Sequence, residues 1–190
     1  MLVLIAAGLF IYNKYKPQNY IVPLARDSVE METAALFAGS DGAFIYKFAA
    51  SSGYSQLRLY ISEYHNGVLI RKGDMRLGFE SNVSPGNGSI LIFPDFQNFM
   101  VKIAISADGG KLSSEMPILE EVPNREYFGR SSTEIQEMTS IRYGEEQPLV
   151  ALIYDNDTMM VIDINDMING DTNALAENDY VYYFSFEFIK

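Results

Sequence analysis

Short runs of β-branched and aromatic residues, separated by turn-forming residues, dominate this chain of 190 residues. Such runs are typical of β-strands, and the Gly, Asn, Asp and Pro residues between them are typical of turns. The predicted strands are 28–36, 43–49, 56–64, 68–72, 75–81, 89–93, 99–106, 116–121, 135–141, 149–154, 159–164 and 180–189. Strands that are this numerous and this closely spaced predict an all-β chain.

A β-hairpin is expected around Asn66-Gly67. This dipeptide suits a type I′ turn, because that turn needs a positive φ at both of its central residues. The turn would place His65 opposite Val68 and Tyr64 opposite Leu69.

Two other segments alternate in a way that predicts one buried face, because side chains point to opposite sides along a strand. In 99–106 the odd-numbered residues are all large and apolar. In 180–189 the residues Tyr182, Phe184, Phe186 and Phe188 share one face. We therefore expect a two-layer antiparallel β-sandwich, immunoglobulin-like or jelly-roll-like, with an open barrel as the alternative.

The chain divides by composition into three parts. Residues 1–16 are expected to form an apolar helix, 17–27 a polar linker and 28–190 a single β-rich domain. Helix is scarce in the domain, and the best candidate is a short helix within 165–176 with Asp and Asn near both ends as caps.

The N-terminal segment, Met1 to Tyr12, has no charged residue. A helix of this length reaches about 18 Å, against about 30 Å for a hydrocarbon core. Tyr15 suits a membrane interface, and Lys14 and Lys16 can extend their ammonium groups to it. We expect an uncleaved signal-anchor; a signal peptide and a core element of the fold are the alternatives.

The expected location is the cell membrane, with a single pass and an extracytoplasmic domain. Lys14 and Lys16 favour a cytoplasmic location for the residues that follow, but two lysines are a weak bias. Residues 1–16 would then be the contact with the membrane.

Net charge argues against nucleic acid as a partner. The formal charge is −11, and the fourteen Lys and Arg residues are scattered, with no run longer than Arg71-Lys72. Binding to phosphate backbones depends on clustered basic residues that release counterions.

Signatures of catalysis are also missing from the sequence. The chain has no Cys and a single His, His65, so cysteine nucleophiles and sites built from several histidines are excluded. No Gly-x-Ser-x-Gly and no phosphate-binding Gly-x-x-x-x-Gly-Lys is present. We expect no enzyme; the alternative is a hydrolase that uses carboxylates alone, for which the acids 120/121, 145/146, 155/157 and 177/179 are candidates.

Two groups of residues are candidates for binding. Tyr54, Tyr60 and Tyr64 flank the predicted hairpin, and Tyr60 and Tyr64 should share a face from which their rings could contact a ligand. Asp155, Asp157, Asp163 and Asp166 lie in a segment rich in oxygen ligands suited to calcium, although Asp and Asn also simply favour turns. No other cofactor is expected.

These observations predict a membrane-tethered binding or sensing module that recognises a protein or an envelope ligand. The alternative from another class is a structural or assembly subunit of a membrane complex that contacts its neighbours through strand edges. An exposed aromatic surface would favour the first, and a long unpaired edge strand or a large apolar patch would favour the second.

Overall fold

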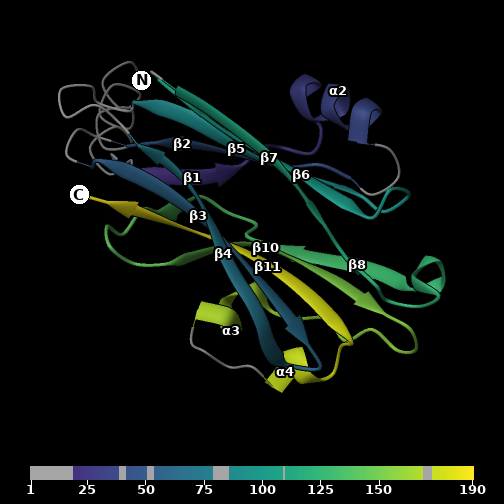
Figure 1. Cartoon of the computed structure of the whole chain (residues 1–190). Helices are drawn as coiled ribbons and strands as arrows, with labels where there is room; N and C mark the ends of the chain where they lie inside the picture. Colours follow the sequence, from purple (N-terminus) through teal and green to yellow (C-terminus); the bar gives the residue numbers. More distant parts are fainter. Residues whose placement is uncertain (1–18, 39–41, 51–53, 79–85, 109, 169–172) are drawn as a thin grey trace, which may run out of the picture.

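A computed structural model describes residues 19–38, 42–50, 54–78, 86–108, 110–168 and 173–190. These residues form two antiparallel β-sheets that pack face to face as two layers (Figure 1). The all-β character and the two-layer arrangement predicted from the strand pattern are therefore confirmed. The predicted apolar helix at residues 1–16 lies outside the described residues.

The strands divide unevenly between the two layers. Sheet A contains, in spatial order, β7 (Gly110–Pro117), β6 (Met100–Ala107), β5 (Asn87–Asp95), β2 (Phe44–Ala49), β1 (Tyr20–Pro23) and β9 (Thr139–Ser140). Sheet B contains β4 (Val68–Gly78), β3 (Gln56–His65), β11 (Tyr180–Ile189), β10 (Gln147–Asp155) and β8 (Gly129–Glu134). Consequently β4 and β8 are the edge strands of sheet B within the described residues.

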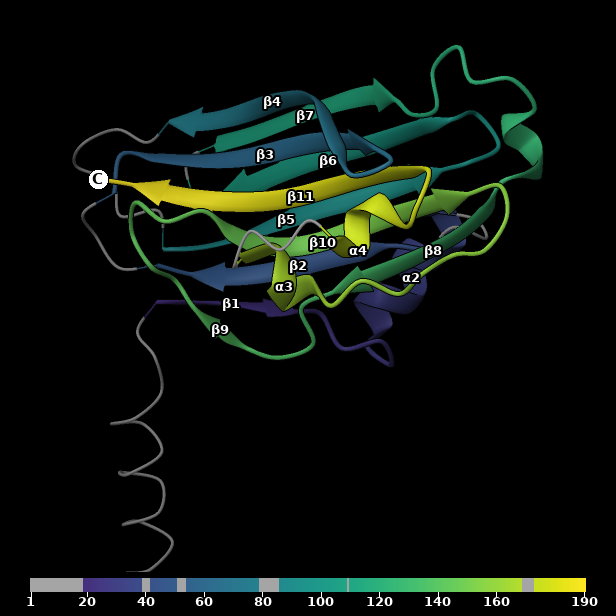
Figure 2. The same cartoon turned by 90° about the horizontal axis from the view of Figure 1, so that it is seen from below.

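Strand direction gives the sandwich two distinct ends. Strand β1 begins at the end where the chain terminates, and Tyr20 pairs there with Ala49 (Figure 2). The β3–β4 turn lies at the opposite end, because β3 runs away from the end at which β11 finishes. Ten residues of β3 place this turn about 30 Å from the end where β1 begins.

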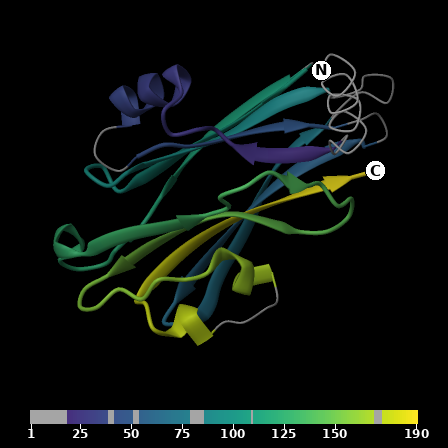
Figure 3. The same cartoon turned by 180° about the vertical axis from the view of Figure 1, so that it is seen from behind.

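Short helices lie outside both layers (Figure 3). Helix α2 (Val29–Ala38) covers sheet A, while α3 (Ile164–Ile168) and α4 (Asn173–Ala176) cover sheet B; a 3₁₀ turn, η2 (Arg125–Tyr127), precedes β8. Met31 of α2 packs with Ala43 and Ile45 in a small hydrophobic cluster that is separate from the main core. Among the described helices, none has the length and apolar character needed to cross a membrane.

The core between the sheets is aromatic, as predicted from the alternation of aromatic residues in the last strand. Tyr182, Phe184, Phe186 and Phe188 are all completely buried. Phe188 joins the layers, since its ring centroid lies 5.3 Å from that of Phe48 on β2. Aromatic side chains bury large apolar areas, so β11 contributes strongly to stability.

The predicted hairpin is confirmed in its turn and in its register. Asn66 and Gly67 have φ values of 47° and 76°, the positive values that a type I′ turn needs. His65 pairs with Val68 and Tyr64 with Leu69. The predicted strands 68–72 and 75–81 are one strand, β4, because Gly73 and Asp74 remain in the ladder with β3.

The strand predicted at 28–36 is wrong, because this segment is helix α2. The Oγ of Ser28 accepts a hydrogen bond from the Met31 N–H at 3.2 Å, which caps the first turn. Glu30 and Glu32 lie in that turn, where negative charge stabilises the helix dipole.

The boundary between linker and domain also needs correction. Residues 20–23, expected within the linker 17–27, form β1 between β2 and β9. Their backbone gains ladder pairing on both sides, and the Ile21 side chain is fully buried. The sheet therefore begins at Tyr20.

Three other predicted elements differ from the structure. The strand expected at 116–121 lies earlier, as β7, and Leu119 and Glu121 adopt positive φ in the bend that follows. The strand expected at 135–141 is replaced by β8, a loop and β9, and 159–164 forms no strand. The helix expected within 165–176 corresponds to α3 and α4.

Candidate functional site

The three tyrosines predicted to bind a ligand do not lie together. Tyr60 and Tyr64 share the outer face of β3, on the opposite side from the core residues of that strand. Tyr54 instead lies in the core, 4% exposed, with its ring centroid 4.7 Å from that of Phe188. The outer aromatic surface therefore contains only Tyr60 and Tyr64 of the predicted set.

Polar groups around Tyr60 are bound to one another. The Tyr60 hydroxyl donates to Glu187 Oε2 at 2.5 Å, and Lys72 Nζ lies 4.7 Å from the centre of the Tyr60 ring. Lys72 also forms an ion pair with Glu146 at 2.6 Å. The other carboxylate oxygen of Glu146 accepts a hydrogen bond from Ser185 Oγ at 2.5 Å. Burial, with the hydrogen bond to Glu187, raises the pKa of Tyr60, so its hydroxyl remains a donor at neutral pH. The result is an ordered surface.

Strand β4 forms the edge of this surface. It is eleven residues long and pairs with β3 on one side. Within the described residues no strand pairs with its other side. Such an edge presents N–H and C=O groups to which another chain can bind.

The two halves of β4 differ in chemistry. Val68, Leu69 and Ile70 are 61%, 47% and 56% exposed, and they follow one another directly after the turn. The second half carries charges that are paired within the chain: Arg71 Nη2 lies 2.9 Å from Glu63, and Arg76 pairs with Asp74. Charges and bulges protect an edge from unwanted pairing. The apolar half carries no charge, and an irregularity in its pairing with β3 falls at Ile70, between the pairs Tyr64–Leu69 and Glu63–Arg71.

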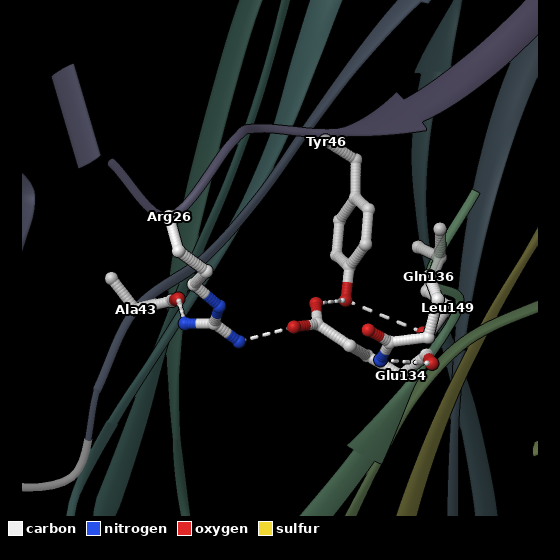
Figure 4. A network of polar contacts seen from close by, with 6 residues as sticks. All are labelled: Arg26, Ala43, Tyr46, Glu134, Gln136 and Leu149. Atoms are coloured by element: carbon white, nitrogen blue, oxygen red, sulfur yellow. Dashed lines mark hydrogen bonds and ion pairs between the residues drawn. The ribbon is translucent and has the colours of Figure 1, made fainter. Parts of the chain in front are cut away.

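The other edge strand of sheet B, β8, carries a charged network that links it to sheet A (Figure 4). Glu134 on β8 pairs with Arg26, which lies between β1 and α2 and donates to the Ala43 carbonyl at 3.1 Å. The Tyr46 hydroxyl on β2 donates to the other Glu134 oxygen at 2.9 Å. The same hydroxyl lies 3.3 Å from the Leu149 carbonyl oxygen.

The hydrogen bond between Tyr46 and Glu134 is shielded from solvent, and the ion pair of Glu134 with Arg26 is less so. Tyr46 is completely buried, and the Glu134 side chain is 12% exposed, whereas the Arg26 side chain is 58% exposed. Burial, and after it the negative charge of Glu134, raises the pKa of Tyr46 well above its ordinary value. Tyr46 is therefore a permanent donor to a carboxylate that also has a cation beside it.

A cleft of about 230 Å³ lies next to the network, between the two sheets. Its lining comes from β2 and β5 of sheet A and from β8 and β10 of sheet B: Phe44, Pro94, Arg130, Ser131, Ser132, Leu152 and Tyr154. Phe44 precedes Tyr46 by two residues and Ser132 precedes Glu134 by two, so the network lies next to one end of the cleft. The lining includes one arginine and no acid.

The single histidine, His65, is the last residue of β3, at the end of the sandwich away from the start of β1. His65 Nε2 is 3.2 Å from Glu63 Oε1, and its ring packs against Tyr180 with centroids 4.4 Å apart. Glu63 also accepts from the Tyr182 hydroxyl at 3.1 Å. The His65 side chain is thus half-buried.

Asp155 and Asp163, two of the predicted calcium ligands, accept hydrogen bonds from backbone amides. Asp155 Oδ1 accepts from the Asp157 N–H at 2.7 Å, and Asp163 Oδ1 accepts from the Asn165 N–H at 2.8 Å. These are the turn interactions that Asp favours. In the part of the chain that is described, no three His, Cys, Asp or Glu side chains form a group suited to a metal. The calcium site, with Asp166 as its fourth residue, stays a prediction.

Sequence patterns missed the residues of the network and the cleft. Glu134 and Tyr46 are 88 residues apart, and Glu134 and Arg26 are 108 apart, with no spacing that marks them as neighbours. The strand alternation of 43–49 does place Tyr46 on the buried face, and a buried Tyr hydroxyl requires a partner. That partner becomes visible only when the sheets are stacked.

The fold and these surfaces define a two-sheet antiparallel β domain with an apolar edge strand on one side and an inter-sheet cleft on the other. A family model described as the YgaN domain matches residues 25–188, so the chain belongs to the YgaN domain family. No curated protein and no solved structure is significantly similar to the chain.

Proposed function

We propose that this chain is a membrane-tethered, extracytoplasmic binding module without catalytic activity, and that strand β4 is its binding edge. The observation that carries the proposal is the exposed run Val68–Ile70 on an eleven-residue edge strand. An extended segment of a partner protein would add to β4 through main-chain hydrogen bonds, with apolar side chains over this run. The partner class is a protein, as predicted for the binding module.

Two properties support β4 over other exposed apolar residues. Its three exposed apolar residues lie on an edge strand, whereas Met159–Val161, also exposed, form no strand and Leu36 lies on helix α2. Single exposed apolar side chains are common on protein surfaces and indicate nothing. The charges of the second half of β4 are satisfied within the chain, which leaves the apolar half for a partner.

The position of the edge suits a tethered module. Residues 1–16 would form the apolar helix in the membrane, four residues before β1 begins. The β3–β4 turn would then extend about 30 Å beyond the end of the domain nearest the membrane. We also propose an immunoglobulin-like or jelly-roll-like kind of sandwich, because the chain passes repeatedly between the two sheets.

Site-specific photo-cross-linking in the expressing cell tests the edge. A photoreactive residue at Leu69 should form a discrete adduct with one protein, identified by mass spectrometry, and the same residue at Leu36 should not. Adding Ile70→Lys should remove the adduct at Leu69 while the melting temperature stays the same. Equal cross-linking at both positions, or none at Leu69, would refute the binding edge.

Location is tested separately. The chain has no cysteine, so Leu36→Cys introduces a unique thiol on an exposed helix. An impermeant maleimide should label it in intact cells, and deletion of 1–16 should release the domain from the membrane fraction. Labelling only after lysis would place the domain on the cytoplasmic side.

A further inference from the structure

We propose that the cleft between the two sheets, bordered by β8, binds a small carboxylate that carries one aromatic ring or a short alkyl chain. This site is separate from β4, which lies at the opposite edge of sheet B. The inference therefore stands or falls independently of the protein-binding edge.

The size and the lining of the cleft set the apolar part of the ligand. Its volume is about 230 Å³, and Phe44, Leu152 and Tyr154 face it from both sheets. An apolar cavity of about 150 Å³ is large enough for benzene. The cleft therefore has room for one ring and a small polar group.

The charge around the cleft determines which polar group the ligand carries. Arg130 lines it, with its guanidinium 4.7 Å from the centre of the Phe96 ring, so the side chain is supported above the aromatic residues. Arg26 lies over the ring of Phe44 at 5.4 Å. Guanidinium groups bind carboxylates through paired hydrogen bonds. In a chain of net charge −11, a cleft with a basic border is a local exception.

Glu134 at the end of the cleft does not oppose an anion there. Its two oxygens are bound by Arg26 and by the Tyr46 hydroxyl, so its charge is already compensated. Strand β8 supplies further donors, because within the described residues its edge away from β10 pairs with no strand. Ser131 and Ser132 place that edge at the border of the cleft.

The test uses benzoate, with benzyl alcohol as the neutral molecule of the same shape, and the full chain labelled with ¹⁵N. For a ligand of this size the expected Kd of benzoate is about 0.01 to 1 mM. Amide shifts should concentrate at Ser131, Ser132 and Leu152. Benzyl alcohol should bind about tenfold more weakly, because it lacks the charge that Arg130 recognises.

Variants separate the parts of this proposal. Arg130→Gln should weaken benzoate about tenfold and leave benzyl alcohol unchanged, while Arg142→Gln, at an exposed arginine elsewhere, should change neither. Ser132→Phe should block both molecules by filling the cleft from its border, with the melting temperature as the control for folding. Shifts that centre on β4, equal binding of the two molecules, or no shift at about 10 mM benzoate would overturn the site.

Discussion

Replacing Tyr46 by Phe should destabilise the domain although it removes a single oxygen atom. The hydroxyl is buried and donates at 2.9 Å to Glu134 on the opposite sheet. A hydrogen bond to a charged group contributes about 1.5–3 kcal/mol to stability. Phe keeps the ring in the core and leaves Glu134 with Arg26, so we expect a loss of about 1.5–2.5 kcal/mol.

The comparison with Arg26 makes this prediction specific. Arg26 forms the ion pair of the same network, but its side chain is 58% exposed. Ion pairs at exposed positions contribute about 0–1 kcal/mol, because water and salt screen them. Tyr46→Phe should therefore be more damaging than Arg26→Ala. Tyr127→Phe, at a residue 76% exposed, is the matched control and should stay within about 0.5 kcal/mol of the parent.

A double variant measures the contact itself. Among the described residues, Glu134→Ala leaves the Tyr46 hydroxyl with only the Leu149 carbonyl, at 3.3 Å. Groups in direct contact couple by about 0.5–3 kcal/mol. The combined loss in Tyr46→Phe/Glu134→Ala should therefore be smaller than the sum of the two single losses by about 0.5–2 kcal/mol.

Urea unfolding followed by far-UV circular dichroism is the suitable assay, since the chain has no tryptophan to report by fluorescence. The slope of the unfolding free energy against urea concentration should be the same in each variant, which shows that only stability has changed. The reasoning would be refuted if Tyr46→Phe matched Tyr127→Phe, or if Arg26→Ala were the more damaging of the two.

The remaining predictions concern the core, the turn and pH. Deleting Tyr180–Lys190 should abolish cooperative melting, because it removes the central strand of sheet B; a cooperative melt of the shortened chain would contradict this. Phe188→Ala should cost about 3–5 kcal/mol by urea unfolding, and a loss below about 1 would mean that the ring does not join the sheets. Gly67→Ala should lower the melting temperature more than Gly42→Ala, because both residues have positive φ but only at Gly67 would the new Cβ lie 2.8 Å from helix α4. Burial raises the pKa of Tyr182, so the stability it contributes is complete below about pH 10 and falls as pH rises further; unfolding free energies from pH 7 to 11 that stayed constant would refute this.

How far the fold could be predicted depended on whether the signal was local. The Asn66-Gly67 turn follows from backbone sterics of two adjacent residues, and its register was predicted residue by residue. The helix at 29–38 was missed although a local signal existed, namely Ser28 before an acidic first turn. Tyr20–Pro23 were missed for another reason: four residues form a strand only because β2 and β9 lie on either side.

The candidate sites show the same division. Tyr60 and Tyr64 share a face because strand side chains alternate, and this was predicted. Tyr54 was grouped with them by proximity in sequence, but it precedes β3 and turns into the core. That the apolar run 68–70 lies on an edge strand depends on which strands occupy the sheet, which local patterns do not encode.

The amino-acid sequence by itself determined the strand content, the positions of many strands, the hairpin register and the buried face of the last strand, because these depend on side-chain alternation and turn sterics over a few residues. Tertiary structure alone decided which strands became edges, where helix α2 rests and how Tyr46 meets Glu134. Those contacts join residues far apart in the chain. They form only when the burial of both sheets offsets the entropy of closing the long loops between them.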